Sequence, residues 1–172
     1  MNRLISVKAF TKAKGGFSLY ELFEQKYKEC EKSLFLVAIG YLHNTEDAKD
    51  CMQEAVLSAL KSFDNMKNKE YFKTWFTRIV INKCKDFIKK RRYTEKLDDT
   101  LNVFYDMPLA EINIVDCICR INSKLSVYIT LRFYNEMTYE EMAKALKLPV
   151  STVKYKTKKA LLELKKHLEG DL

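Results

Sequence analysis

The chain has 172 residues, 47% of them hydrophobic, with only four glycines and two prolines, a composition that favours a soluble and almost entirely helical protein. Its longest apolar run, residues 34–39, is too short to span a bilayer, and the N-terminus lacks the apolar core of a signal peptide, so we expect a cytoplasmic protein with no membrane insertion. The formal net charge of +8 is concentrated in residues 82–92 and 147–166. Solubility alone does not require such segregation of positive charge, so the pattern favours contact with nucleic acid at two places.

Residues 1–16 are predicted to be a short extension, and residues 17–92 a first helical domain that starts with a helix over 19–41. A second helix should follow a cap at Asn44 or Thr45, with acidic residues in its first turn. Apolar residues line one side of this second helix. Its polar side carries Asp50, Gln53 and Glu54.

A third helix is expected from about residue 71 to residue 92. Arg78, Asn82, Lys85 and Lys89 recur at the spacing of one helical side, so a single asparagine lies within a row of cations. An asparagine in such a row can read a base while its neighbours hold phosphates. The pattern therefore predicts a nucleic-acid contact. The alternative is that the two basic segments are solvated helix ends.

Two aromatic residues near the start of this helix, Tyr71 and Trp75, are candidates for stacking on unpaired bases. Aromatic residues at helical spacing more often belong to a core. We therefore favour a core position for Trp75.

The five cysteines predict neither disulfides nor a metal site. Cys30, Cys51 and Cys84 fall at apolar helical positions, where a reduced thiol behaves as a small hydrophobe. Cys117 and Cys119 are separated by a single residue, and both are far in sequence from the two histidines. No phosphate-binding glycine loop or nucleophile signature is present either, so we expect no cofactor, no catalytic residues and no enzyme activity.

Residues 93–111 contain five acidic residues against one lysine, together with Pro108, and are predicted to be an acidic linker. Residues 112–172 form the second domain. The predicted fold class is therefore all-α, with two small helical domains joined by a flexible linker.

Residues 138–166 have the pattern of a helix-turn-helix. Thr138 and Glu141 form a capping box for its first helix, and Ser151 and Thr152 can cap its second helix after a turn over residues 147–149. One side of the second helix is apolar, and the other side suits the major groove of DNA. The predicted buried stripe is Val153, Thr157, Ala160, Leu161, Leu164 and Leu168, and the predicted outer face is Ser151, Lys154, Tyr155, Lys158 and Lys159.

Three segments in this order resemble the extracytoplasmic-function (ECF) group of bacterial RNA polymerase sigma factors, in the sigma-70 family. The segment over residues 47–63, DAKDCMQEAVLSALKSF, looks like the family's polymerase-binding region. The promoter-melting and −10 recognition helix is similar to residues 72–92, FKTWFTRIVINKCKDFIKKRR. The helix-turn-helix that reads the −35 element resembles residues 138–160, TYEEMAKALKLPVSTVKYKTKKA.

The resemblance implies a role for each set of residues. Asp50, Gln53 and Glu54 fall on positions that face the polymerase core, and the loop over residues 65–70 matches a specificity loop. Asn82 matches an asparagine that holds a flipped base. The implied −10-binding set is Arg78, Asn82, Lys85, Lys89, Lys90 and Arg91, and the implied −35-binding set is Ser151, Thr152, Lys154, Tyr155, Lys158 and Lys159.

The implied function is transcription initiation: binding RNA polymerase core at its clamp and flap, recognising −10 and −35 promoter DNA, and melting the promoter. An anti-sigma factor is a further implied partner, and it would hold the protein at the membrane. The linker resembles a segment that threads the polymerase cleft, and a solvated tether is the alternative. The alternative function is a conventional DNA-binding regulator, with the first domain used for sensing or dimerisation.

The sequence departs from the family pattern at several positions. It has Leu125-Ser126 where relatives usually have a leucine followed by proline. Lysine stands at positions 156 and 159, where arginine is frequent, and tyrosine at 155, where a small residue is frequent. Lysine reads guanine less selectively than arginine does, so we expect a different promoter preference from that of arginine-bearing relatives.

Overall fold

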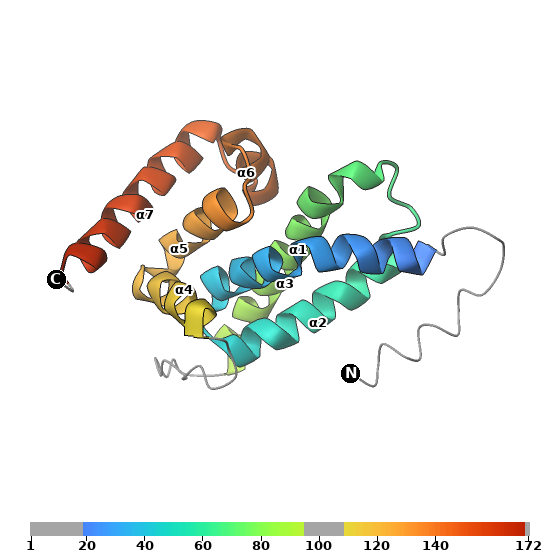
Figure 1. The fold of residues 1–172 in the computed structure, drawn as a ribbon, viewed down its shortest axis with the longest axis horizontal. Coiled ribbons are helices and arrows are strands. Elements are labelled where there is room, and N and C mark those ends of the chain that lie inside the picture. Colours follow the sequence, from blue (N-terminus) through green and yellow to red (C-terminus); the bar gives the residue numbers. More distant parts are fainter. Residues whose placement is uncertain (1–18, 95–108, 171–172) are drawn as a thin grey trace.

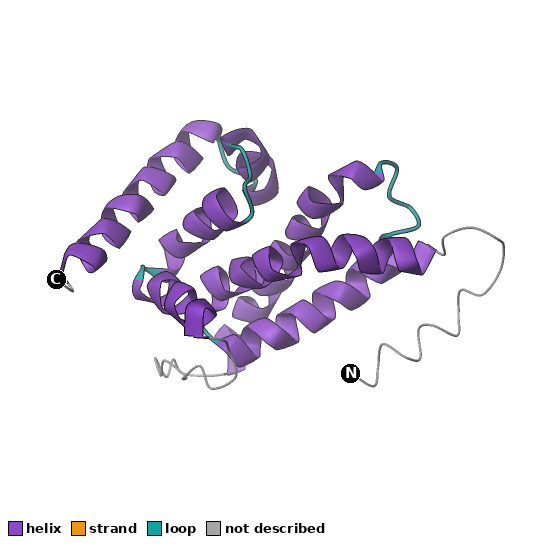
Figure 2. Cartoon of the chain, viewed as in Figure 1, coloured by secondary structure: helices purple, strands orange, loops and turns teal. Residues whose placement is uncertain are grey.

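The structure is a computed structural model, and it describes residues 19–94 and 109–170. Every regular element within these two ranges is helical, in agreement with the predicted fold class (Figure 2). The extension predicted at residues 1–16 lies outside the described residues, as do residues 95–108 of the predicted linker. No helix in the described ranges has both the length and the apolar character needed to cross a membrane.

The first half is a bundle of three long helices, α1 (Leu19–Leu42), α2 (Thr45–Ser62) and α3 (Phe72–Thr94), each packed against the other two (Figure 1). A short helix η2 (Lys69–Tyr71) leads into α3. Asn44 is the N-cap of α2, and its side chain accepts a hydrogen bond from the Asp47 backbone at 3.0 Å. The helix predicted over 19–41 and the cap at Asn44 are therefore confirmed.

An aromatic cluster fills the end of this bundle nearest η2. Phe76 is fully buried, and its ring centroid lies 5.6 Å from that of Phe72, 6.0 Å from Phe23 and 6.2 Å from Trp75. Trp75 is half-buried and packs against the core, as predicted. Tyr71 instead remains 64% exposed.

The second half contains four α-helices and a π-helical turn. They are α4 (Leu109–Arg120), α5 (Ser123–Ile129), the π-turn η3 (Thr130–Tyr134), α6 (Tyr139–Leu146) and α7 (Val150–Gly170). The range predicted as a linker thus overlaps both neighbouring helices, since residues 93–94 belong to α3 and residues 109–111 to α4.

The helix-turn-helix consists of α6 and α7. Thr138 caps α6 with both hydrogen bonds of the predicted capping box, which confirms that prediction. The predicted caps at Ser151 and Thr152 are wrong, because α7 already begins at Val150 and both residues lie in its first turn. The chain turns between the helices at Lys147, which ends α6 in the left-handed conformation with a φ of 58°.

The buried stripe predicted for α7 is only partly correct. Val153, Thr157 and Ala160 are fully buried, but Leu161 is 39% exposed. Its neighbour Leu162 is 53% exposed. The buried side of α7 is therefore narrower near its C-terminal end than the helical period predicted, because none of the helices within residues 19–94 and 109–170 covers Leu161 fully.

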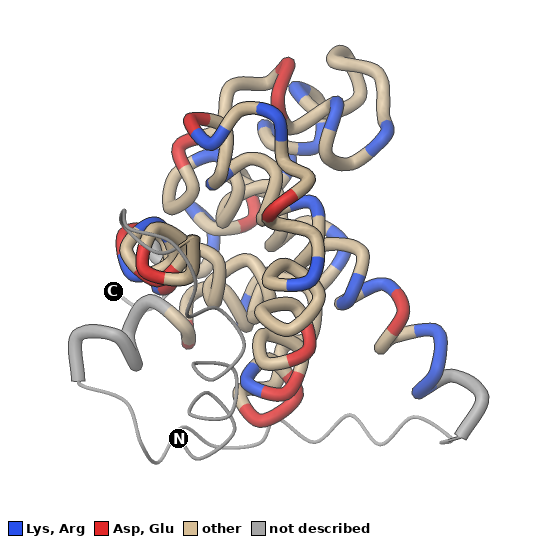
Figure 3. The backbone as a smooth tube through the Cα atoms, turned by 90° about the vertical axis from the view of Figure 1, so that its right-hand side faces the viewer, with Lys and Arg blue, Asp and Glu red and all other residues tan. Residues whose placement is uncertain are grey.

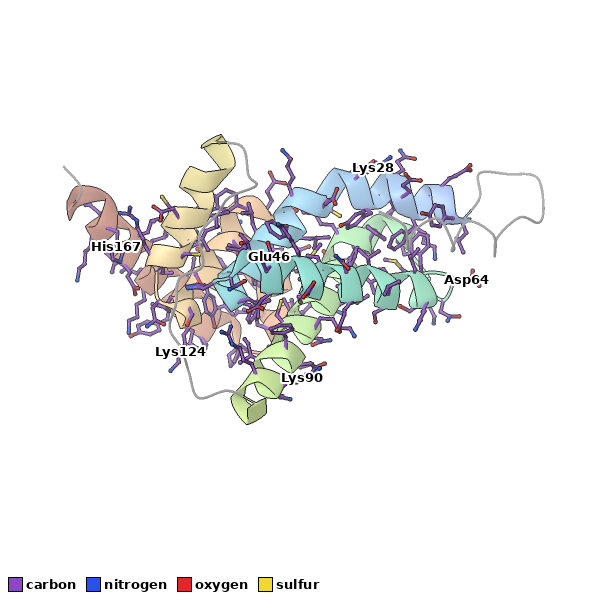
Figure 4. The ribbon with its side chains drawn as sticks, turned by 90° about the horizontal axis from the view of Figure 1, so that it is seen from below. Lys28, Glu46, Asp64, Lys90, Lys124 and His167 are labelled. Carbon is purple, nitrogen blue, oxygen red and sulfur yellow. The ribbon has the colours of Figure 1, made fainter. Side chains whose placement is uncertain are left out.

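The two halves pack against each other in this structure. Helix α1 contacts α4, α5 and η3 of the second half, and α3 contacts α6 (Figure 1). In Figure 4, Asp64, which follows α2, and His167, on α7, lie at opposite ends of the molecule.

His43, between α1 and α2, lies at the contact between the halves. Its Nε2 is 2.8 Å from the Ser126 hydroxyl of α5, which donates to the Gly40 carbonyl at 2.6 Å. Because the single Ser126 proton goes to Gly40, we infer that His43 Nε2 carries a hydrogen and donates it to Ser126. Burial lowers the pKa of His43 from its ordinary value of 6.5.

The lowered pKa predicts that stability falls in mild acid. The folded state favours the neutral imidazole, so its contribution to the unfolding free energy is complete above about pH 6.5 and is lost as pH falls through the lower folded-state pKa. Urea unfolding between about pH 8 and about pH 5 should show a steeper loss for the wild type than for His43→Gln. Equal slopes for the two proteins would contradict the prediction.

Candidate nucleic-acid interface

The −10-binding residues predicted on α3 lie along one helix, but their surroundings differ. Arg78, Asn82 and Lys89 are exposed. Lys85 is half-buried, and its pKa is lowered first by burial and then by the positive charges of Lys147 and Lys89. The structure thus leaves Asn82 open to solvent and turns Lys85 towards the helix-turn-helix.

The last turns of α3 carry a dense basic run, visible in Figure 3 as blue segments interrupted by one acidic residue before the grey part of the chain. Lys90 and Arg91 are both exposed. The Arg91 guanidinium donates to Asp47 of α2 at 2.9 Å, so a phosphate would compete with this carboxylate. Figure 4 shows Lys90 on the same side of the molecule as Lys124 at the start of α5.

The predicted polymerase-binding residues share the outer side of α2. Asp50, Gln53 and Glu54 are all exposed, at the i, i+3 and i+4 spacing of one helical side. Glu54 has a partner within the chain, Lys83 of α3, at 3.5 Å. An exposed pair of this kind contributes little to stability, so Glu54 remains accessible to another protein.

The loop between α2 and α3 is held by a residue that the sequence analysis did not select, Lys69. Its ammonium group donates to the backbone carbonyls of Phe63 and, at 2.8 Å, of Met66, and it lies 4.3 Å from the centroid of the Phe63 ring. Asn68 in turn caps η2 through the Glu70 backbone at 2.9 Å. No sequence pattern signals Lys69, because its partners are main-chain carbonyls.

On α7 the predicted outer face is largely exposed. Ser151, Lys154, Lys158 and Lys159 are exposed and Tyr155 is 66% exposed, as the helical period predicted, whereas Thr152 is half-buried. The ammonium group of Lys154 lies 5.7 Å from the centroid of the ring of Tyr139, the first residue of α6, so the two helices meet here in a cation–π contact.

The cysteine chemistry agrees with a structural role. Cys51 and Cys84 are buried with their sulfurs 3.2 Å apart, and this hydrogen bond together with burial raises the pKa of Cys84. Burial raises the pKa of Cys30 to about 12. Such thiols stay protonated, which makes them poor nucleophiles and poor metal ligands. Within the described ranges, no group of three or more histidine, cysteine or acidic residues is arranged to hold a metal ion.

Exposed cations lie on two helices of the described residues, one of them the second helix of a helix-turn-helix, and this arrangement is typical of a DNA-binding transcription factor. Comparison with known proteins agrees. The family model for Sigma-70 region 2 matches residues 27–94, and the model for Sigma-70 region 4 matches residues 127–166.

Two curated relatives are also RNA polymerase sigma factors by name. The RNA polymerase sigma factor SigV of Bacillus subtilis is 26% identical over 135 residues, covering 76% of this chain and 81% of SigV. The ECF RNA polymerase sigma factor SigW of the same organism is 26% identical over 154 residues, covering 78% and 82%. The chain belongs to the sigma-70 family of RNA polymerase sigma factors, in its ECF group, and is a transcription initiation factor rather than an enzyme.

The fold has a solved counterpart. The sigma factor RpoE of Bartonella quintana, crystallised with the anti-sigma factor NepR, superimposes with a TM-score of 0.69 at 18% identity, covering 87% of this chain and 98% of RpoE. At that identity the likeness concerns the fold alone.

Proposed function

We propose that this sigma factor joins RNA polymerase core through the exposed side of α2 and then engages a promoter through α3 and α7. The observation that carries the proposal is the exposed Asn82 within the row of cations on α3. A conventional regulator that uses its first half for sensing or dimerisation has no need of such a row. Asp50, Gln53 and Glu54 are the proposed contacts with the polymerase clamp, and the second half is proposed to dock on the flap.

Promoter melting gives Asn82 its proposed role. Extruding a base from the duplex costs a few kcal/mol, so an initiation factor must capture the unpaired base and the phosphates beside it. The Asn82 amide offers both a donor and an acceptor to a base edge. Arg78, Lys85 and Lys89 lie one to two turns away on the same helix and supply the phosphate contacts, with Lys90 and Arg91 extending them.

The helix-turn-helix is proposed to bind the −35 element as duplex. Ser151, Thr152 and Tyr155 are placed to meet base edges, and the lysines to meet phosphates. We further propose that the protein acts in the cytoplasm, and that an anti-sigma factor restrains it and holds it at the membrane. The superposition with RpoE, which was crystallised with such a factor, supports an anti-sigma partner.

Reconstitution tests the proposed function directly. The purified protein, added to core polymerase from the same cell, should give transcripts that start at defined genomic sites. Asp50→Lys combined with Glu54→Lys should abolish assembly with core while leaving binding to −35 duplex intact, because only the α2 side is reversed in charge. A protein that binds duplex tightly but forms no complex with core would overturn the proposal.

Lys158 allows a separate test of the −35 surface. If it contacts a phosphate, Lys158→Ala should weaken duplex binding about equally for all sequences and lower the salt slope, log K against log salt concentration, by about 1. Fluorescence anisotropy with labelled duplexes measures both quantities. Lys28→Ala, on the exposed surface of α1, is the matched control and should leave the slope unchanged.

A further inference from the structure

The loop between α2 and η2, drawn in teal in Figure 2, begins with a tight turn. The Met66 backbone amide closes the turn by donating to the Phe63 carbonyl at 3.1 Å, so Asp64 and Asn65 are its two central residues. Both central residues are exposed. A single backbone hydrogen bond adds little net stability in water, so the turn needs further support to keep one shape.

Lys69 supplies that support by holding both ends of the turn. Its ammonium group donates to the Phe63 carbonyl and, at 2.8 Å, to the Met66 carbonyl. The Asp64 carbonyl lies 3.5 Å from the same nitrogen. An ammonium group has three N–H donors, and these three acceptors match them in number. The charge of the half-buried Lys69 is therefore directed into the loop rather than towards a phosphate.

Phe63 gives the Lys69 ammonium a second reason to stay in this place. Phe63 is the C-cap of α2, where the last carbonyls of the helix lack intrahelical partners and carry the negative end of its dipole. Its buried ring has a centroid 4.3 Å from the Lys69 nitrogen, within the range of a cation–π contact. A neutral side chain at position 69 would remove the charge that draws these carbonyls together.

The exposed polar side chains of the loop differ in what they can offer a nucleic acid. Asn68 is engaged with Glu70, because its oxygen accepts from the Glu70 backbone at 2.9 Å and its nitrogen donates to the Glu70 carboxylate at 3.4 Å. The Asp64 carboxylate would repel phosphates, and the Lys67 ammonium would attract them whatever the sequence. The Asn65 amide has both a donor and an acceptor for a base edge. Asn65 is therefore the loop side chain best suited to select a base.

The loop lies where the proposed DNA-binding side of α3 begins. Trp75, Arg78 and Asn82 recur at i, i+3 and i+7, on one side of the helix. The helix starts at Phe72, directly after η2, and Asn82 is ten residues further on, about 15 Å at ~1.5 Å per residue. That is the length of about four stacked nucleotides at ~3.4 Å each. A strand held at Asn82 that runs towards the start of α3 thus reaches the loop within a few nucleotides.

We propose that Lys69 is a positioning residue for base selection, which fixes the turn so that Asn65 meets an unpaired base a few nucleotides from the one bound by Asn82. This inference rests on the proposed function, because it needs a promoter strand on α3. Lys69 itself does not touch the DNA. Its loss should blur the choice among bases and leave the number of phosphate contacts unchanged, whereas loss of a phosphate-binding lysine does the opposite.

Hydrogen exchange of the full-length protein, without polymerase or DNA, tests whether Lys69 orders the turn. Lys69→Met keeps a long stem but no charge, so the Met66 amide should exchange several-fold faster while the core helices keep their protection. Lys67→Met removes the same charge from an exposed neighbour, and this matched control should exchange as the wild type does. Lys69→Arg should restore part of the protection, because a guanidinium group also donates to carbonyls.

Base selection is the readout that a merely structural role would not move. Holoenzyme made with core polymerase from the same cell is titrated with forked promoter probes that carry each of the four bases at one unpaired position at a time. At one such position Lys69→Met should lower the preference among bases several-fold, with the salt slope of binding unchanged. Lys67→Met should keep the preference. In an Asn65→Ala background, Lys69→Met should cause no further loss, because the two residues act as one unit.

Three results would refute the positioning role of Lys69. The first is an unchanged exchange rate of the Met66 amide in Lys69→Met, and the second is an unchanged base preference in that variant. The third is an equal loss of preference in Lys67→Met, which would assign the effect to charge alone. If even the wild type forms no promoter complex with core, the proposed function fails and base selection with it, while the exchange rates still decide whether Lys69 orders the turn.

Discussion

Replacing Asn82 with alanine should reduce open-complex formation far more than it reduces binding to core polymerase. The asparagine is exposed on α3 in the middle of the cation row, so its loss should remove the proposed base contact without disturbing the core. A base contact of this kind contributes about 1–3 kcal/mol, which corresponds to roughly a 5- to 150-fold lower open-complex equilibrium constant. Permanganate footprinting of the promoter, with parallel titration of core, measures the two quantities.

Two further variants make this result specific. Asn82→Asp should be at least as damaging, because a carboxylate within the row repels the phosphates that its neighbours attract. Gln25→Ala, which removes an exposed amide on α1, should leave both measurements unchanged. Equal loss of core binding and melting in Asn82→Ala would show that the residue does not act on the unpaired base.

Phe76→Ala should cause the largest loss of stability that the structure predicts. The ring is fully buried among Phe23, Phe72 and Trp75. Removing a buried phenylalanine ring costs about 3–5 kcal/mol, because apolar contacts are lost and the cavity closes only in part. Chemical denaturation followed by tryptophan fluorescence reports on this cluster directly, since the single tryptophan, Trp75, lies within it.

The control for Phe76 is its exposed neighbour Tyr71. Tyr71→Ala should change the unfolding free energy by no more than about 0.5 kcal/mol, because the side chain is 64% exposed and lies outside the cluster. If Tyr71→Ala instead weakens promoter melting while stability is kept, the stacking role considered for this residue gains support. A similar loss of stability in both variants would contradict the core described for this half.

The sequence predicted those parts of the site that follow from helical geometry. The spacing of Arg78, Asn82 and Lys89 places them on one side of a helix wherever that helix packs, and the same holds for Lys154 and Lys158 on α7. Short-range capping was equally predictable at Asn44 and Thr138. The error at Ser151 and Thr152 arose because both are good cap residues, yet α7 begins before them, at Val150.

Long-range packing decided the rest. No residue pattern predicted that Lys69 closes the loop after α2, because its partners are carbonyls of the backbone. Leu161 fits an apolar helical period, but only neighbouring helices determine how wide the buried stripe becomes. Lys85 shares its helical side with Asn82, but its pKa is lowered by burial and by the charge of Lys147, a residue far away in the sequence.

By itself the sequence determined the helical class, the two basic surfaces and the resemblance to ECF sigma factors, because composition, helical period and motif order are local properties of the chain. Only the tertiary structure decided how the two halves meet. Gly40 and Thr130 are 90 positions apart, and Asn135 bonds to residues on both α1 and α3. Contacts between such distant residues depend on the shape of both surfaces at once, and no local pattern encodes that complementarity.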